Sequence, residues 1–135
     1  AVGKAILSEL AWEQVVEIAE HTALPRFTEN TLTDIEALGG DLEETRARGY
    51  AIDHEEHELG VCCVGAGIRD ACGQPIASCS VSGPTEAFSE ARIKEWAMRI
   101  VDVAQETSRR MGYVPKRSPA VLLAMPGTRF ERGSS

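Results

Sequence analysis

The chain has 135 residues, of which 43% are hydrophobic and 26% are charged, and this composition favours one globular domain. No apolar run approaches the ~20 residues of a membrane-spanning helix, and no signal-peptide pattern is present, so we expect a cytoplasmic protein without membrane contacts. The net charge of −7 is uneven: residues 114–135 carry +3 and the remainder carries −10, a charge that repels the phosphates of nucleic acids.

The first part of the chain has the apolar spacing of helices. Hydrophobic residues three and four positions apart predict helices over residues 1–10 and 12–20, with a short break between them. The stretch "LPRFTENTLTD" that follows contains proline and several threonines, and we predict a loop there.

A third helix is predicted after this loop. Thr33 is the expected N-cap, and Glu36 would close a capping box with it. Gly39 and Gly40 should cost this helix roughly 2 kcal/mol relative to two alanines. Gly49 is the expected C-terminal end.

Beyond Tyr50 the apolar period changes to two, which predicts a sheet. The expected strands are "GYAID", "ELGVCCVGAGIRD" and "GQPIASCSVSG", the last two forming an antiparallel hairpin with a turn at residues 70–73. A four-residue loop would set Cys63 opposite Ser80 and Val61 opposite Ser82. Strand alternation then separates a polar face, Cys63, Gly65, Ser78, Ser80 and Ser82, from a core face, Cys62, Val64, Ala66, Ile68, Ala77, Cys79 and Val81.

The last predicted helix begins with Ser89 as its cap and with Phe88 and Ile93 as a hydrophobic staple. Its apolar residues recur at helical spacing, so we expect it to lie against the sheet. The segment 114–135 holds three of the six prolines and is predicted to be a basic tail outside the domain.

The sequence contains no motif that is typical of a metal or cofactor site. The four cysteines show no C-x-x-C spacing, so free thiols are expected and a zinc site is not. The run "DHEEH" lacks the H-E-x-x-H spacing of a helical zinc site, and we interpret it as a solvated polar loop. We therefore predict no metal and no cofactor.

The polar face could bind a ligand, because the Cys63 thiol and the hydroxyls of Ser80 and Ser82 offer neutral donors to a carboxylate. A solvated strand face would carry the same residue types, and alternation alone does not separate these readings. Two further alternatives stay open: a small enzyme that uses Cys63, although its surroundings are acidic rather than positive, and an oligomerisation module without a ligand.

Four stretches of this chain resemble successive blocks of one protein family: "AVGKAIL", "RFTENTLTD", "RARGYAIDHEEHELGVCCVGAGIRDACGQPIASCSVSGP" and "FSEARIKEWAMRIVDVAQETSRRMGY". They are similar, from Ala1 to about Tyr113, to the effector-binding domain of IclR-type bacterial transcriptional regulators. The resemblance implies a GAF-like α/β fold, an antiparallel sheet flanked by helices, over residues 1–113. It implies a sensor of a small organic or aromatic acid, and no enzyme.

The resemblance also implies a binding site and partners. The implied effector-binding residues are Ala1, Val2, Asp53, Cys63, Ser80 and Ser82. The main chain of the first two would add the positive end of a helix to the thiol and hydroxyls. A homodimer or tetramer is implied, with DNA bound only through a separate N-terminal winged helix-turn-helix. We expect that domain, and the first part of the effector domain, to be missing from this chain.

Overall fold

The computed structural model describes residues 1–115, so the predicted tail lies outside them except for Val114 and Pro115. Its centre is a three-stranded antiparallel sheet in the order β1 (Ala51–His54), β2 (Val61–Arg69) and β3 (Pro75–Pro84). The three predicted strands are thereby confirmed. Within the described part of the chain, no helix combines the length and apolar character needed to cross a membrane.

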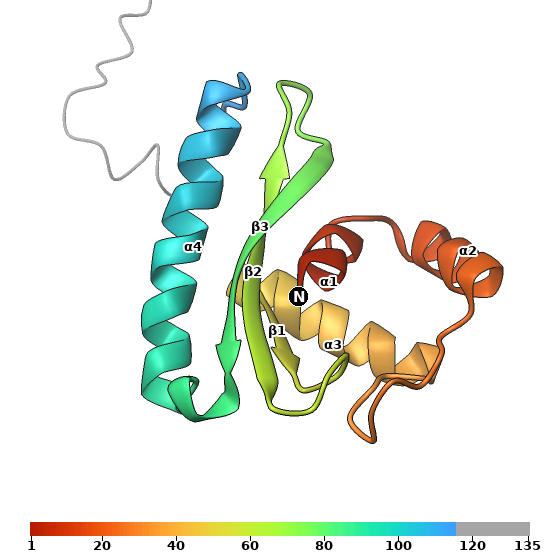
Figure 1. Cartoon of the computed structure of the whole chain (residues 1–135). Helices are drawn as coiled ribbons and strands as arrows, with labels where there is room; N and C mark the ends of the chain where they lie inside the picture. The colour runs from red at the N-terminus through yellow and green to blue at the C-terminus, as the bar shows by residue number, and fades with distance from the viewer. Residues whose placement is uncertain (116–135) are drawn as a thin grey trace, which may run out of the picture.

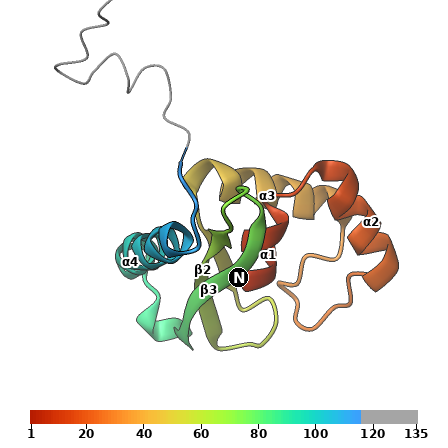
Figure 2. The ribbon, with the colours of Figure 1, turned by 90° about the horizontal axis from the view of Figure 1, so that it is seen from above.

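The helices divide between the two faces of this sheet (Figure 1). One face carries α4 (Glu90–Arg110), which follows the short 3-10 turn Thr85–Ala87. The other face carries α1 (Val2–Leu7), and the view from above shows α3 (Ile35–Arg48) and α2 (Trp12–Thr22) on that same side (Figure 2).

The predicted division of strand residues into a core face and a polar face is confirmed. Cys62 and Val64 of β2 are buried with Phe88, Ile93 and Ala97 against α4. A second cluster continues this core toward the end of α4 and contains Ala66, Ile68 and Ala104, with Ala77 and Cys79 packed against it.

The predicted hairpin register is wrong by two residues. Cys63 pairs with Ser82 rather than with Ser80, and Val61 pairs with Pro84 rather than with Ser82. The loop has one more residue than expected, because the main-chain nitrogens of Cys72 and Gln74 both donate to Oδ1 of Asp70. Arg69 pairs with Pro75 but Ile68 pairs with Ala77, so a bulge adds one residue to β3 and accounts for the second residue of the shift. A shift of two keeps each side chain on its face.

One helix cap was predicted one residue too early. The N-cap of α3 is Asp34, whose Oδ1 accepts from the main-chain nitrogen of Glu36, while the Thr33 hydroxyl accepts from Arg26. Two other predicted helix ends are confirmed: Gly49 closes α3 in the left-handed conformation, with φ of 87°, and the Ser89 hydroxyl caps α4 by accepting from the Arg92 nitrogen. The helix predicted over residues 1–10 is shorter and ends at Leu7, and the one predicted over residues 12–20 continues to Thr22.

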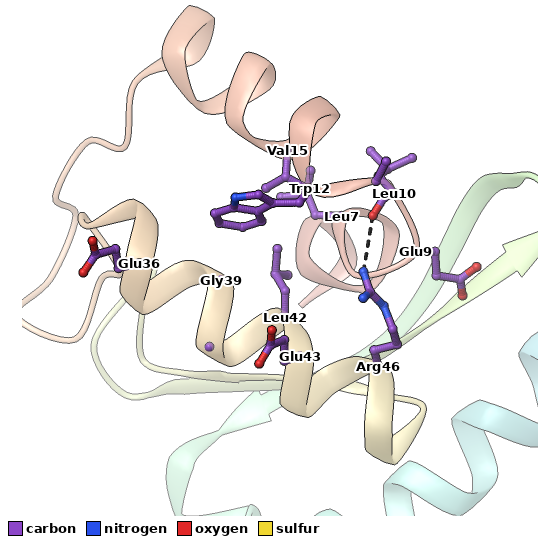
Figure 3. A pocket seen from close by; sticks show the side chains of 12 residues that line it. Leu7, Glu9, Leu10, Trp12, Val15, Glu36, Gly39, Leu42, Glu43 and Arg46 are labelled. Carbon is purple, nitrogen blue, oxygen red and sulfur yellow. Dashed lines mark hydrogen bonds between the residues drawn. The ribbon is translucent and has the colours of Figure 1, made fainter.

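A second core joins α2 to α3 on the side of the sheet away from α4. Val15, Leu38 and Leu42 are buried there. Trp12 lies over α3, and a Cβ atom added at Gly39 would be 2.8 Å from its Cη2 atom (Figure 3). The indole thus occupies the space that a side chain at residue 39 would need. Glycine at this position destabilises the helix, but it allows the ring to pack against α3.

Charged side chains connect α1 and the residues after it to α3 and β2. Arg46 of α3 donates to the carbonyl oxygens of Ser8, at 2.7 Å, and Leu10, at 3.3 Å. Glu9 forms an ion pair of 2.7 Å with Arg69 at the end of β2. Burial raises the pKa of Glu9 above its ordinary value, although the charges of Arg69 and Arg46 oppose that shift.

The two adjacent glycines of α3 allow a matched test. Gly40 has no atom within 4 Å of an added Cβ, so Gly40→Ala should raise the free energy of unfolding by about 0.5–1 kcal/mol. Gly39→Ala forces the indole of Trp12 to move and should be at least about 1 kcal/mol less stable than Gly40→Ala. Urea unfolding measures both, and equal stabilisation by the two alanines would contradict this packing.

The raised pKa of Glu9 predicts a pH dependence. Above the ordinary value of 4.5 the unfolded chain loses this proton before the folded chain does, so the folded state loses stability as pH rises toward the raised pKa. Relative to Glu9→Gln, the wild type should therefore become less stable between pH 4 and pH 7. Unfolding of both proteins at the two pH values tests this, and the opposite trend would mean that the ion pair with Arg69 outweighs desolvation.

Candidate functional site

Three of the predicted site residues lie in one row across the sheet. Asp53 of β1 pairs with Cys63 of β2, and Cys63 pairs with Ser82 of β3. Directly paired residues project from the same side of a sheet, with strands about 4.8 Å apart. The carboxylate, the thiol and the hydroxyl therefore point to the same side, and Ser80 follows in the next row, opposite Gly65.

The start of α1 lies over Gly65, beside this row. A Cβ atom at Gly65 would be 3.2 Å from the Cβ of Ala1, and the main-chain nitrogen of Ala1 is 3.7 Å from Oδ2 of Asp53. The hydroxyl of Ser78 donates to the carbonyl of Val2 at 3.2 Å. The structure thus brings all six predicted residues to one region. We call Cys63, Ser80 and Ser82 the serine face.

Access to the serine face is open from one side. Ser80 and Ser82 are exposed, whereas Asp53 and Cys63 are half-buried. The helix above them, α1, has six residues and no side-chain cap. Its contribution to binding an anion would come from the free N–H groups of its first turn rather than from the dipole of a long helix.

The segment of residues 53–57 includes the end of β1 and the turn after it, and we call it the site loop. It fixes the orientation of Asp53. Oδ1 of Asp53 accepts from the main-chain nitrogen of Glu56 at 2.8 Å. The Glu56 carboxylate in turn accepts from the nitrogen of His54 at 3.0 Å. Glu55 between them has a φ of 56°, a conformation uncommon for residues other than glycine.

Lys4 holds the site loop against two helices. Its ammonium is 2.9 Å from Glu56 and 3.1 Å from Asp41 of α3, and it also donates to the carbonyl of Ile52. The exposed fractions of the three charged side chains are only 13%, 16% and 24%. The positive charge is therefore fully used inside the protein. Sequence reasoning did not identify Lys4, although a lysine inside the apolar stretch "AVGKAIL" is an unusual placement.

Two threonines tie the site loop to the loop between α2 and α3. The hydroxyl of Thr28 donates to the carbonyl of Glu55 at 2.6 Å, and that of Thr31 donates to the carbonyl of Glu56. Thr28 is buried. The sequence predicted only a loop at "RFTENTLTD", because the partners of these hydroxyls are 25 or more residues away.

The other cysteines differ from Cys63 in their surroundings. Cys62 is buried on the core face, and burial raises the pKa of Cys79 on the same face, so that thiol stays protonated. The histidines of "DHEEH", His54 and His57, are exposed. Over residues 1–115, no three His, Cys, Asp or Glu side chains gather as a metal site would require.

A hollow also lies elsewhere, between α2 and α3 (Figure 3). It has a volume of about 760 Å³ and contains none of the six predicted residues. Its cation, Arg46, already donates to two main-chain carbonyls, and Glu36 and Glu43 add negative charge to the rim. This hollow is therefore poorly suited to a carboxylate.

The family model described as "Bacterial transcriptional regulator IclR C-terminal" matches residues 1–109. The chain belongs to the IclR family. The predicted GAF-like fold, an antiparallel sheet flanked by helices, is confirmed, and it is the fold of the IclR effector-binding domain.

Three relatives illustrate the match. The HTH-type transcriptional repressor AllR of Salmonella typhimurium is 38% identical over 113 residues, which are 84% of this chain and 42% of AllR. The crystal structure of Thermotoga maritima IclR has a TM-score of 0.79 at 40% identity, over 82% of this chain and 45% of that one. A double mutant of the PobR inducer-binding domain from Acinetobacter, in complex with 3-hydroxybenzoic acid, has a TM-score of 0.70 at 27% identity, over 82% and 62%.

These relatives are transcriptional regulators, and the IclR chain described here spans about two fifths of the length of AllR. The resemblance first seen in the sequence is thereby confirmed at the level of the family. The six effector-binding residues stay a prediction, which the geometry of the row makes testable.

Removal of Lys4 should reveal its role in this site. Lys4→Met leaves the carboxylates of Glu56 and Asp41 without their cation and should lower the free energy of unfolding by about 2–4 kcal/mol. The double variant Lys4→Met, Glu56→Gln should lose less unfolding free energy than the sum of the losses of the two single variants. A double-mutant cycle in urea measures the coupling, and strictly additive effects would show that the ion pair contributes nothing.

Proposed function

We propose that this IclR domain binds a small organic or aromatic acid on the serine face and thereby controls DNA binding by a separate N-terminal winged helix-turn-helix. The observation that carries the proposal is the row Asp53, Cys63 and Ser82, with Ser80 beside it and Ala1 above. Three strands and one helix converge there. Neutral donors and one carboxylate share the face, which suits a ligand that is both acidic and hydroxylated.

The chemistry of binding follows from these groups. The hydroxyls of Ser80 and Ser82 and the thiol of Cys63 donate to the ligand carboxylate, together with main-chain N–H groups of Ala1 and Val2. A hydrogen bond to a charged group contributes about 1.5–3 kcal/mol. Asp53 would repel a second carboxylate, so it accepts from a hydroxyl group of the ligand. An acidic protein can in this way hold an anion without a free basic side chain.

Two properties of the relatives support the proposal. The PobR inducer-binding domain was crystallised with 3-hydroxybenzoic acid, an aromatic hydroxy acid. AllR is a helix-turn-helix repressor and is more than twice as long as the matched region. We accordingly propose residues 1–113 as the sensing domain of a cytoplasmic regulator that acts as a homodimer or tetramer, without enzymatic turnover.

Isothermal titration of the chain with small acids tests this function. Pyruvate, succinate, glycolate and 3-hydroxybenzoate form a suitable set. Ser80→Ala and Ser82→Ala should each weaken the best ligand by about tenfold or more. Ser78→Ala is the matched control, because that hydroxyl already donates to Val2, and it should change the affinity much less.

Two results would count against the proposal. If none of the acids binds while the protein remains folded, the serine face is a solvated strand surface and an oligomerisation module becomes the better description. If an acid binds equally well to Ser80→Ala and Ser82→Ala, a sensor exists but its site lies elsewhere.

A further inference from the structure

The hollow between α2 and α3, which we call the α2–α3 hollow, leaves apolar side chains uncovered. Leu7, Val15 and Leu42 line it, and the indole of Trp12 lies beside them (Figure 3). Trp12 is nevertheless 45% exposed. A large aromatic ring that is half open to solvent next to aliphatic side chains forms a surface that another apolar group can cover.

The rim of the α2–α3 hollow is negatively charged. Glu36 and Glu43 of α3 belong to the lining, and both are exposed. Among residues 1–115, neither carboxylate has a cation within ion-pair distance. The cation of the lining, Arg46, donates to two main-chain carbonyls. A segment that fits this hollow therefore combines an apolar stretch with positive charge.

One segment of the same chain has this combination and lies outside the described residues. Residues 120–125, "AVLLAM", are six consecutive apolar residues. Lys116 and Arg117 precede them, and Arg129 and Arg132 follow them. A run of this length is a liability on a protein surface unless something covers it. The apolar run matches the uncovered side chains of the hollow, and the flanking charges are opposite in sign to those of its rim.

The apolar segment is close enough to reach the hollow of its own chain. Pro115, the last described residue, lines a neighbouring space together with Gly49 and Glu9. Gly49 ends α3, and Glu9 also lines the α2–α3 hollow. Along α3, Gly49 is about 15 Å from Gly39, over which the indole lies. Leu123 is eight residues beyond Pro115, a length that spans at most about 26–29 Å.

We propose that residues 120–125 bind in the α2–α3 hollow of their own chain, with the basic residues on either side near Glu36 and Glu43. This contact covers the indole of Trp12 and closes the gap between α2 and α3 from outside. It is independent of the proposed acid site, because none of the residues of the serine face lines this hollow.

The fluorescence of Trp12 in the whole chain tests this contact. Trp96→Phe leaves Trp12 as the single tryptophan. In that background, the double variant Leu122→Asp, Leu123→Asp should at least double the acrylamide quenching constant of Trp12, because the apolar segment leaves the hollow and the indole becomes accessible.

Matched variants separate the contact from a general effect of charge. Ser134→Asp with Ser135→Asp adds the same charge beyond the apolar segment and should leave the quenching constant unchanged. On the domain, Glu43→Lys should raise the quenching constant, because it repels the basic residues that flank the segment. Glu44→Lys, one residue further along α3 and outside the lining, should not.

Three results would overturn the inference. The first is equal quenching before and after the two leucine substitutions, and the second is an equal effect of the two serine substitutions. The third is protection of Trp12 that disappears when the protein is diluted, because a second copy would then fill the hollow. If Trp96→Phe lowers stability, the ¹⁹F spectrum of the chain labelled with 5-fluorotryptophan gives the same comparison with Trp96 retained.

Discussion

The close approach of α1 to β2 is the constraint on which the site depends. Two glycines of β2 make it possible: side chains at Gly65 and Gly67 would meet Ala1 at 3.2 Å and the Glu9 carboxylate at 2.9 Å. Because α1 can lie this low on the sheet, Ala1 is above Gly65, next to the row of paired residues, and Lys4 reaches the site loop. Larger residues in β2 would lift the helix and separate the main chain of Ala1 from Asp53.

The electrostatic arrangement explains how an acidic domain can take an acidic ligand. Lys4 contacts the site loop, but its ammonium is paired with Glu56 and Asp41. Recognition of the ligand therefore depends on neutral donors whose positions are fixed by strand pairing. Strands fix side chains more firmly than loops do, which favours preorganisation of the thiol and hydroxyls. The carboxylate of Asp53 is oriented by the main chain of its own loop.

Much of this architecture could be predicted from local patterns, and the failures have physical causes. Period-two alternation assigned the core and polar faces correctly, since alternation depends only on adjacent residues. The register failed because the Asp70 side chain builds a five-residue loop and a bulge follows it, neither of which alternation records. Lys4, Thr28 and Thr31 were missed because their partners are 25 to 52 residues away in sequence.

The five-residue loop and the bulge of the β2–β3 hairpin have a consequence for how this region can change during evolution. Each contributes one residue to the offset between the strands, and only their combination leaves the serines opposite the thiol side of β2. Deleting one residue while keeping the other feature would rotate the serines of β3 into the core beneath α4 and bring Cys79 and Val81 to the surface. Natural length variation in this hairpin should therefore occur in steps of two, with odd steps surviving only where the bulge is gained or lost at the same time.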